Sequence, residues 1–395
     1  MSLKPATRCV NFPNSDEHGA VAPPIYQTAT FRQPGALEFG EYDYTRSGNP
    51  TRHLLEQQIA ELEGGAHASA FASGMAAITA LARIFNSGDE IVAGDDLYGG
   101  TVRLLESVLS RQAMAVRYVD TTDLAAVRAA VSARTKLILI ETPSNPLLRI
   151  SDIRGLSQIA TEAGALLAVD NSMLSPILQQ PLSLGADFVI HSATKFLCGH
   201  SDVTAGAVVT NDRVLHERIA FQQNAEGAAL APFESWLLLR GLKTLALRVE
   251  RQNESALKIA QFLKNNETIR SVYYPGLSDH PGHQLQRSQA EGDGSVITFT
   301  TGNAELSRKI VEGTKLFTIA VSFGSVGSTI SLPCRMSHAS IPFDLREKLA
   351  PPEDLIRLSV GIEDPGDLIE DLGRALAAAE QQSGHESLAA AVSVA

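Results

Sequence analysis

The chain has 395 residues, of which 44% are hydrophobic and 19% are charged, a composition typical of globular rather than disordered proteins. Its 33 lysines and arginines against 44 aspartates and glutamates give a formal net charge of −11, so we expect no nucleic-acid partner. Cys9, Cys198 and Cys334 are too far apart in sequence to suggest a disulfide framework, and a cytoplasmic location fits them best. Residues 1–14 lack the apolar core of an export signal, and no apolar run approaches the ~18 residues of a membrane span.

Residues 1–60 are predicted to form an N-terminal arm that ends in the first helix. Prolines at positions 23, 24, 34 and 50 interrupt every local period in this segment. Such an arm has no core of its own and must lie on another part of the molecule or of its assembly.

Residues 61–250 are predicted to form a large α/β domain. Short apolar runs rich in β-branched residues alternate here with Ala- and Leu-rich helical patterns. This alternation favours βαβ units, with a mostly parallel sheet that carries helices on both faces. The clearest predicted strands are 90–93, 136–140, 165–169 and 187–190.

Residues 251–395 are predicted to form a smaller α+β domain. One long helix is expected to lead into it over 235–263, where apolar residues recur at helical spacing. The tail after Gln381 is expected to fray. The other expected elements are strands at 294–300 and 329–332 and helices at 303–313 and 365–379.

The strongest local signal for chemistry is Lys195, which ends the segment His-Ser-Ala-Thr-Lys directly after a predicted strand. Open α/β sheets bind ligands at the carboxyl ends of their parallel strands. A lysine amine that is desolvated there loses its proton and can form a Schiff base with an aldehyde. A lone Ser-x-x-Lys segment is more often a loop with a solvated lysine, so the neighbouring motifs must decide.

Two further segments point to pyridoxal phosphate, an aldehyde cofactor with an electron-accepting ring. Asp170 ends another predicted strand and could hold the positive charge of a buried ring nitrogen, although alone it would more often be a helix N-cap. Ser73, Gly74 and Met75 lead into a helical pattern, whose free backbone N–H groups favour a phosphate. A glycine turn alone is weak evidence, and it gains weight only beside Lys195 and Asp170.

A series of segments in fixed order carries a family resemblance over nearly the whole chain. These segments are 23–28, 44–51, 73–75, 96–101, 141–146, 169–171, 192–195, 235–245, 274–277 and 357–363. The chain resembles the fold-type I pyridoxal phosphate enzymes of cysteine and methionine metabolism. That family contains cystathionine γ-synthase, cystathionine β- and γ-lyases, methionine γ-lyase and homoserine-ester sulfhydrylases.

The resemblance implies roles for the residues around the cofactor. Lys195 would form the Schiff base with the cofactor and move protons between substrate carbons, and Asp170 would pair with the ring nitrogen. Tyr98 would stack on the ring and take part in proton transfer. The expected phosphate ligands are the backbone N–H groups of Gly74 and Met75 and the hydroxyls of Ser192 and Thr194.

The resemblance also implies a substrate side and a subunit interface. Arg357 would grip the α-carboxylate of an amino-acid substrate, with Asn145 nearby and Ser322 on the loop that shapes the pocket. Tyr44 and Arg46 are similar to residues that reach the phosphate of a neighbouring subunit. The smallest active unit would then be a homodimer, and a homotetramer built from two dimers is expected by resemblance.

Other classes of site find less support in the sequence. There is no GxxxxGK[ST] motif for a P-loop and no GxGxxG after a strand for a dinucleotide fold. His280 and His283 flank a Pro-Gly turn without a third ligand nearby, so no metal site is expected. A non-catalytic relative would be expected to have lost Lys195, Asp170 or Arg357, and all three are present.

The chain departs from the family pattern in several places around the substrate. In the loop 322–328, Gly327 stands where many relatives carry a glutamate that can meet the distal amino group of cystathionine, which puts efficient use of cystathionine in question. Gly100 replaces the cysteine of typical methionine γ-lyases, and Met173 replaces a more usual aromatic residue. Cys198 stands where glycine is usual, and we expect it to be a small buried filler.

We therefore predict a pyridoxal phosphate-dependent carbon–sulfur lyase of sulfur amino-acid metabolism. It would act by β- or γ-elimination on cystathionine, methionine or a related amino acid and release ammonia and a 2-oxoacid. The alternative within the family is γ-replacement on an O-acyl-homoserine, as in cystathionine γ-synthase or a homoserine-ester sulfhydrylase. The alternative from a different class is a non-catalytic relative with the same fold.

Overall fold

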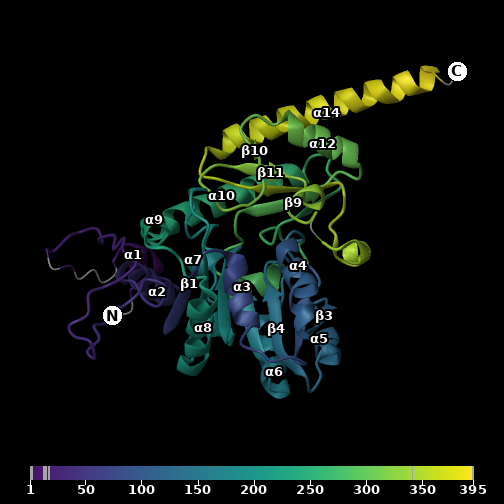
Figure 1. The fold of residues 1–395 in the computed structure, drawn as a ribbon. Helices are drawn as coiled ribbons and strands as arrows, with labels where there is room; N and C mark the ends of the chain where they lie inside the picture. The colour runs from purple at the N-terminus through teal and green to yellow at the C-terminus, as the bar shows by residue number, and fades with distance from the viewer. Residues whose placement is uncertain (1–2, 12–15, 17, 340, 394–395) are drawn as a thin grey trace.

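The computed structural model describes residues 3–11, 16, 18–339 and 341–393. In this part of the chain two β-sheets carry helices and lie one beyond the other, and the N-terminal arm projects to one side (Figure 1). No helix among these residues is both long and apolar enough to cross a membrane.

The larger sheet is mostly parallel, as the sequence predicts. Its strands are β1 (His67–Phe71), β2 (Glu90–Gly94), β3 (Ala115–Val119), β4 (Thr135–Glu141), β5 (Leu166–Asp170), β6 (Phe188–His191) and β7 (Gly206–Thr210). They are ordered β1-β7-β6-β5-β4-β2-β3, and β7 alone runs antiparallel to its neighbours. The carboxyl ends of β4, β5 and β6 therefore meet at one edge.

Helices cover both faces of this sheet. They are α2 (Pro50–Glu63), α3 (Gly74–Ala82), α4 (Gly99–Ser107), α5 (Leu124–Ala130), α6 (Ile153–Ala163), α7 (Ser175–Leu178) and α8 (Arg213–Glu226). Side chains alternate along β4, so that Ile138 packs in one cluster with Leu156 of α6, while Leu139 packs in another with Leu81 of α3. Because both faces are buried, the strands read as continuous apolar runs in the sequence.

The smaller sheet lies beyond the carboxyl edge of the larger one. Its strands are β8 (Ser271–Tyr273), β9 (Val296–Thr300), β10 (Thr318–Ile319), β11 (Thr329–Ser331) and β12 (Leu355–Ser359), in the order β10-β11-β12-β9-β8. Its helices are α11 (His283–Gln289), α12 (Ala304–Gly313), α13 (Arg346–Leu349) and α14 (Pro365–Ser393). Apolar side chains of β9, β12, α12 and α14 form one core cluster. Among these strands, β9 and β11 cover the runs expected at 294–300 and 329–332.

The single helix expected over 235–263 is wrong, because the chain forms α9 (Pro232–Leu242) and α10 (Leu245–Lys264) instead. Thr244, between them, has φ −109° and ψ 6°, outside the helical region. A Cβ on Gly241 would lie 2.5 Å from the carbonyl oxygen of Cys198, so the end of α9 lies directly on the loop after Lys195. Periodicity cannot reveal such a break, since both helices keep their apolar spacing.

α14 continues past the end expected at residue 379 to Ser393 and extends away from the rest of the molecule, and the fraying expected after Gln381 stays a prediction (Figure 1). The segment beyond Gln381 contains no proline and is rich in alanine, and good helix formers allow an anchored helix to continue. At the other end of the chain, α1 (Pro5–Val10) precedes the helix that was expected to be the first, α2. The arm lies on α9, where Trp236 Nε1 donates to the carbonyl oxygen of Pro23 at 2.9 Å.

Candidate active site

A cavity of about 410 Å³ lies where the carboxyl ends of β4, β5 and β6 face the smaller sheet. It is lined by residues from segments far apart in the sequence. The predicted site residues in its wall are Gly74, Met75, Tyr98, Asn145, Asp170, Ser192, Thr194, Lys195, Ser322 and Arg357. All predicted site residues except Tyr44 and Arg46 therefore converge on one cavity.

Asp170 is the last residue of β5 and pairs in parallel register with Ile190 of β6. This pairing brings its carboxylate close to the segment that carries Lys195. Ser172 N donates to Asp170 Oδ1 at 2.9 Å. Burial raises the pKa of Asp170, whereas hydrogen bonds from Ser172 and the charges of His191 and Lys195 oppose that rise.

Lys195 lies in the turn after β6, and its amine points toward the smaller sheet. Its Nζ donates to Ser322 Oγ at 2.5 Å and lies 4.9 Å from the centroid of the Phe323 ring. Burial, followed by the charge of Arg357, lowers the pKa of Lys195 to about 8. An amine that loses its proton near this pH can act as a nucleophile and as a base.

The first turn of α3 and Ser192 form a small cradle at one end of the cavity. Ser73 caps α3, since its hydroxyl accepts from Ala76 N at 3.1 Å. The N–H groups of Gly74 and Met75, in the same first turn, have no partner within the helix. A Cβ on Gly74 would lie 2.9 Å from Ser192 Cβ and 3.0 Å from Ser192 Cα, so only glycine permits this close approach. A helix N-terminus beside hydroxyl groups suits a phosphate.

Arg357 lies at the middle of β12 and reaches the cavity from the smaller sheet. It is only 2% exposed, and burial lowers its pKa to about 10. Its Nη1 donates to Asn145 Oδ1 at 2.8 Å, and its Nη2 donates to the carbonyl oxygen of Ser322 at 3.2 Å. These bonds use two of the five guanidinium donors and fix its orientation, so further N–H groups remain for a carboxylate.

Ser322 contacts both cations of the site. Its hydroxyl accepts from Lys195 and its carbonyl accepts from Arg357. Its φ is +82°, in the left-handed region that residues other than glycine rarely adopt. Ser322 is thus a strained residue that contacts both Lys195 and Arg357. Strained residues of this kind concentrate at functional sites.

Tyr98 stands at the start of α4, with its side chain 39% exposed. Its backbone N–H donates to Glu141 Oε2 at 3.1 Å, and its ring meets the His338 ring edge-on, with centroids 6.4 Å apart. A Cβ on Gly100 would collide with the Tyr98 ring, so a cysteine at this position would require that ring to move.

The structure adds residues to the cavity that the sequence did not single out. Glu141 ends β4, next to Asp170, and its pKa is raised well above the usual range by burial and then by the Asp170 charge. Phe323 lies near both cations, and the centroid of its ring is 5.5 Å from Arg357 Cζ. Arg103 of α4 also lines the cavity. For Glu141 the signal was available, because it ends a predicted strand just as Asp170 does.

Tyr44 and Arg46 lie outside this cavity, in a separate hollow of about 380 Å³ beside the arm. Arg46 Nη1 donates to the carbonyl oxygen of Asn224 at 2.7 Å, and its guanidinium lies 5.5 Å from the centroid of the Tyr44 ring. Within one chain these residues do not meet the cofactor residues. Their predicted role in a neighbouring subunit stays a prediction.

The remaining sequence features lie away from the cavity wall. His283 Nδ1 lies 2.7 Å from the carbonyl oxygen of Pro275, and no group of three metal-ligating side chains occurs in the described part of the chain. Cys198 is buried, and its thiol donates to Asp202 Oδ1 at 3.2 Å. Gly327 is exposed and does not line the cavity.

Comparison with known proteins decides the family. The family model described as Cys/Met metabolism PLP-dependent enzyme matches residues 6–377. The chain belongs to this family. Its cofactor is therefore pyridoxal phosphate, and the amine, the carboxylate and the glycine-lined cradle described above fit that cofactor.

Individual family members agree with this assignment. The chain is 55% identical to the chloroplastic cystathionine β-lyase of Arabidopsis thaliana over 93% of this chain and 79% of that one. It is 51% identical to the cystathionine γ-lyase of Bacillus subtilis over 91% and 95% of the two chains. The crystal structure of cystathionine γ-lyase from Lactobacillus plantarum complexed with L-serine superposes with a TM-score of 0.93 at 43% identity, over 96% of this chain and all of that one. The predicted fold and the predicted class, a pyridoxal phosphate-dependent carbon–sulfur lyase of sulfur amino-acid metabolism, are confirmed.

Proposed function

We propose that this chain cleaves the Cβ–S bond of L-cystathionine by β-elimination and releases homocysteine, ammonia and pyruvate. The observation that carries the chemistry is the Lys195 amine, which faces one cavity together with Asp170 and Arg357. The choice of substrate and bond is supported by the 55% identity with a cystathionine β-lyase. A β-elimination also needs no second deprotonation at Cβ, so it makes the smallest demand on the site.

Each residue of the proposed site has one task. Bound pyridoxal phosphate supplies an aldehyde for the substrate amine and a ring that accepts electrons when the α-proton leaves. Arg357, oriented by Asn145, holds the α-carboxylate. Lys195 removes the α-proton and returns a proton to the departing sulfur, and Ser322 orients its Nζ. Asp170 keeps the ring nitrogen protonated.

The distal end of the substrate is proposed to extend toward α4. Arg103 is an exposed side chain on this helix and lines the cavity. A guanidinium at this position suits the second carboxylate that cystathionine carries and methionine and cysteine lack. If Arg103 binds this carboxylate, the use of cystathionine would not require the glutamate that many relatives carry at the position of Gly327.

We further propose a homodimer as the smallest active unit, assembled as a homotetramer, in the cytoplasm. Support for the dimer comes from Tyr44 and Arg46, which are polar arm residues beside a hollow rather than in the cavity of their own chain. Support for a reducing compartment comes from Cys9, Cys198 and Cys334, all of which are free thiols. Sedimentation and cell fractionation test these two assignments.

The test of function uses purified protein with pyridoxal phosphate and, separately, L-cystathionine, L-methionine, L-cysteine and an O-acyl-homoserine with and without L-cysteine. Pyruvate from L-cystathionine, with none from a Lys195→Ala variant, is the expected result. Formation of 2-oxobutyrate from L-cystathionine would show γ-elimination instead. Formation of a thioether from the homoserine ester and L-cysteine, without pyruvate from L-cystathionine, would show γ-replacement.

A further inference from the structure

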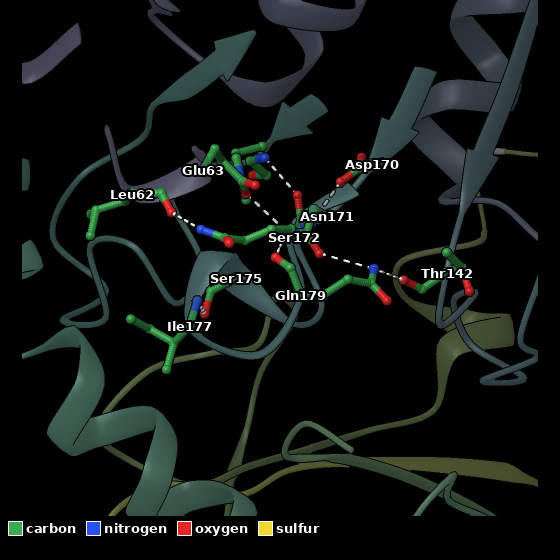
Figure 2. Close-up of polar contacts among 12 residues, drawn as sticks. Leu62, Glu63, Thr142, Asp170, Asn171, Ser172, Ser175, Ile177 and Gln179 are labelled. Carbon is green, nitrogen blue, oxygen red and sulfur yellow. Dashed lines mark hydrogen bonds and ion pairs between the residues drawn. The ribbon is translucent and has the colours of Figure 1, made fainter. Parts of the chain in front are cut away.

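A buried polar network joins the end of α2 to the ends of β5 and β6, directly behind the cofactor site (Figure 2). Its centre is Glu63, the last residue of α2, whose side chain is fully buried. Glu63 Oε1 accepts from Asn171 Nδ2 at 2.9 Å and lies 2.5 Å from His191 Nε2, which donates to it. The His191 side chain is only 1% exposed.

Both partners of Glu63 adjoin residues of the proposed cofactor site. Asn171 follows Asp170 in the chain, and its backbone N–H donates to the carbonyl oxygen of Ile190 at 2.9 Å. His191 precedes Ser192, which helps to form the phosphate cradle. Glu63 thus bonds Asn171, which follows Asp170, and His191, which precedes Ser192.

Ser172 completes the link between these two segments. Its backbone N–H donates to Asp170 Oδ1, and its hydroxyl accepts from Ser192 N at 2.6 Å. The position of the Asp170 carboxylate therefore depends on the relative placement of the β5 and β6 ends, which Glu63 fixes from behind.

The network also reaches the end of β4 through Gln179, as Figure 2 shows. Gln179 Nε2 donates to Asn171 Oδ1 at 3.2 Å and to the carbonyl oxygen of Thr142 at 3.1 Å. Asn171 Nδ2 in turn donates to the carbonyl oxygen of Gln179 at 2.8 Å. The three strand ends that face the cavity are thus tied to one buried carboxylate.

The composition of the network is unfavourable for simple core packing. A buried carboxylate and imidazole lose their hydration, and apolar side chains of similar volume often stabilise a fold as well or better. Glu63 Oε2 has no hydrogen-bond partner within the described residues, so Oε1 alone compensates for burial. A role in positioning neighbouring residues would account for polar residues in this place. The charge of His191 also opposes the burial-induced rise in the pKa of Asp170.

We propose that Glu63 and His191 form a positioning pair for the cofactor, which fixes the strand ends that carry Asp170 and Ser192. The inference rests on the proposed pairing of Asp170 with the ring nitrogen. Glu63 and His191 do not line the cavity, so in this proposal they act only through Asp170 and Ser192.

The test compares Glu63→Gln with a matched control, Glu90→Gln. Glu90 is also buried, at the start of β2, where its Oε1 accepts from Thr135 and Ser132, far from the carboxyl edge. The readouts are the dissociation constant of pyridoxal phosphate from the full-length chain, the visible absorption maximum of the bound cofactor and the unfolding temperature without cofactor. We expect Glu63→Gln to weaken cofactor binding about tenfold or more, as for groups that orient metal ligands, and to shift the absorption maximum. Glu90→Gln should change only the unfolding temperature.

Two further variants, Asp170→Asn and the double variant Asp170→Asn/Glu63→Gln, distinguish failure of the proposed role of Asp170 from failure of the positioning pair. If Asp170→Asn leaves cofactor affinity unchanged, the proposed role of Asp170 fails. If Asp170→Asn weakens binding while Glu63→Gln does not, only the positioning pair is refuted. We expect the two effects to be non-additive, because Glu63 acts through Asp170; fully additive effects would overturn the proposal.

His191→Gln keeps the proposal testable if Glu63→Gln does not fold. The glutamine amide retains a donor toward Glu63 but lacks the imidazole ring. We expect it to keep most of the cofactor affinity and to shift the absorption maximum, whereas His191→Leu should lose both affinity and the wild-type maximum. Wild-type spectra and affinity in both variants would refute the pair.

Discussion

At the scale of single residues, two cations, Lys195 and Arg357, line the same cavity. Lys195 and Arg357 both contact Ser322 and flank the Phe323 ring. The charge of Arg357 is the second cause, after burial, of the lowered pKa of Lys195. Arg357 therefore favours the neutral amine of Lys195, in addition to the carboxylate binding proposed above.

The pH dependence of cofactor attachment should report the Lys195 amine. Because its pKa is lowered to about 8, the free-amine fraction rises with pH up to this value and is nearly constant above it. The rate at which the cofactor's visible band forms on the cofactor-free chain should therefore rise about tenfold per pH unit below 8 and level off above it. Rapid-mixing absorption measures this rate, and Lys195→Ala gives the non-covalent background. A rate that still climbs at pH 10 would contradict the lowered pKa.

Replacement of Arg357 should impair substrate binding more than the rate of the chemical step. Arg357→Lys keeps the charge but loses the planar fork that Asn145 orients. We expect the KM for L-cystathionine to rise roughly tenfold to a hundredfold, with a smaller change in kcat. Arg335→Lys, at an exposed ion pair with Glu353, is the matched control and should leave both constants unchanged. An unchanged KM in Arg357→Lys would refute the carboxylate grip.

At the scale of elements, the cofactor site is assembled from the ends of strands and the start of a helix. Parallel register aligns Glu141, Asp170 and Ile190 along one edge. The first turn of α3 approaches Ser192 across this edge, and Gly74 makes that approach possible. The proposed phosphate cradle therefore depends on the close packing of α3 against Ser192.

A methyl group at Gly74 should damage the cradle more than the fold. In Gly74→Ala the new Cβ would meet Ser192 at about 3 Å, so α3 must retreat from the phosphate. We expect affinity for pyridoxal phosphate to fall about tenfold or more, because the first-turn N–H groups are displaced. Equilibrium dialysis measures the affinity. Gly373→Ala, inside α14 with its nearest neighbour atom at 3.6 Å, should leave affinity unchanged, and equal behaviour of the two variants would disprove the steric argument.

At the scale of the whole molecule, contacts within one subunit explain the position of the arm less well than the positions of the other parts of the chain. It is fastened to α2 and α9, for example by the bond from Asn49 Nδ2 to the carbonyl oxygen of Tyr26 at 2.9 Å. Its Tyr44 ring is nevertheless 42% exposed beside an open hollow. A second subunit that places its cavity against this hollow would use these exposed groups.

Mixed dimers test whether active sites are shared between subunits. Lys195→Ala and Arg46→Ala chains should each be inactive or weak alone. In a mixed dimer, one site would combine an intact Lys195 with an intact Arg46 from the other subunit. Co-refolding equal amounts should therefore restore about a quarter of wild-type pyruvate release, since half of the dimers are mixed and each has one intact site. No recovery in a mixture that forms mixed dimers would show that Arg46 serves its own chain.

Much of the fold and of the site could be predicted because the signals are local. β2, β4, β5 and β6 coincide with apolar runs, since strands buried on both faces admit little else. Lys195 and Asp170 were found because each follows such a run. The break at Thr244 was missed because it depends on contact with a distant loop. The continuation of α14 to Ser393 was missed although its alanine-rich sequence favours a helix.

The sequence by itself determined the family and the cofactor, because its ordered motifs carry the lysine, the aspartate and the glycine turn, but it left elimination and γ-replacement both open. Only the tertiary structure showed that Glu141, Phe323 and Arg103 join the cavity and that Gly327 does not. Only the tertiary structure, too, placed Glu63 against His191 across 128 positions of sequence. The physical reason is that strand register and helix packing bring residues together across distances over which no sequence period extends.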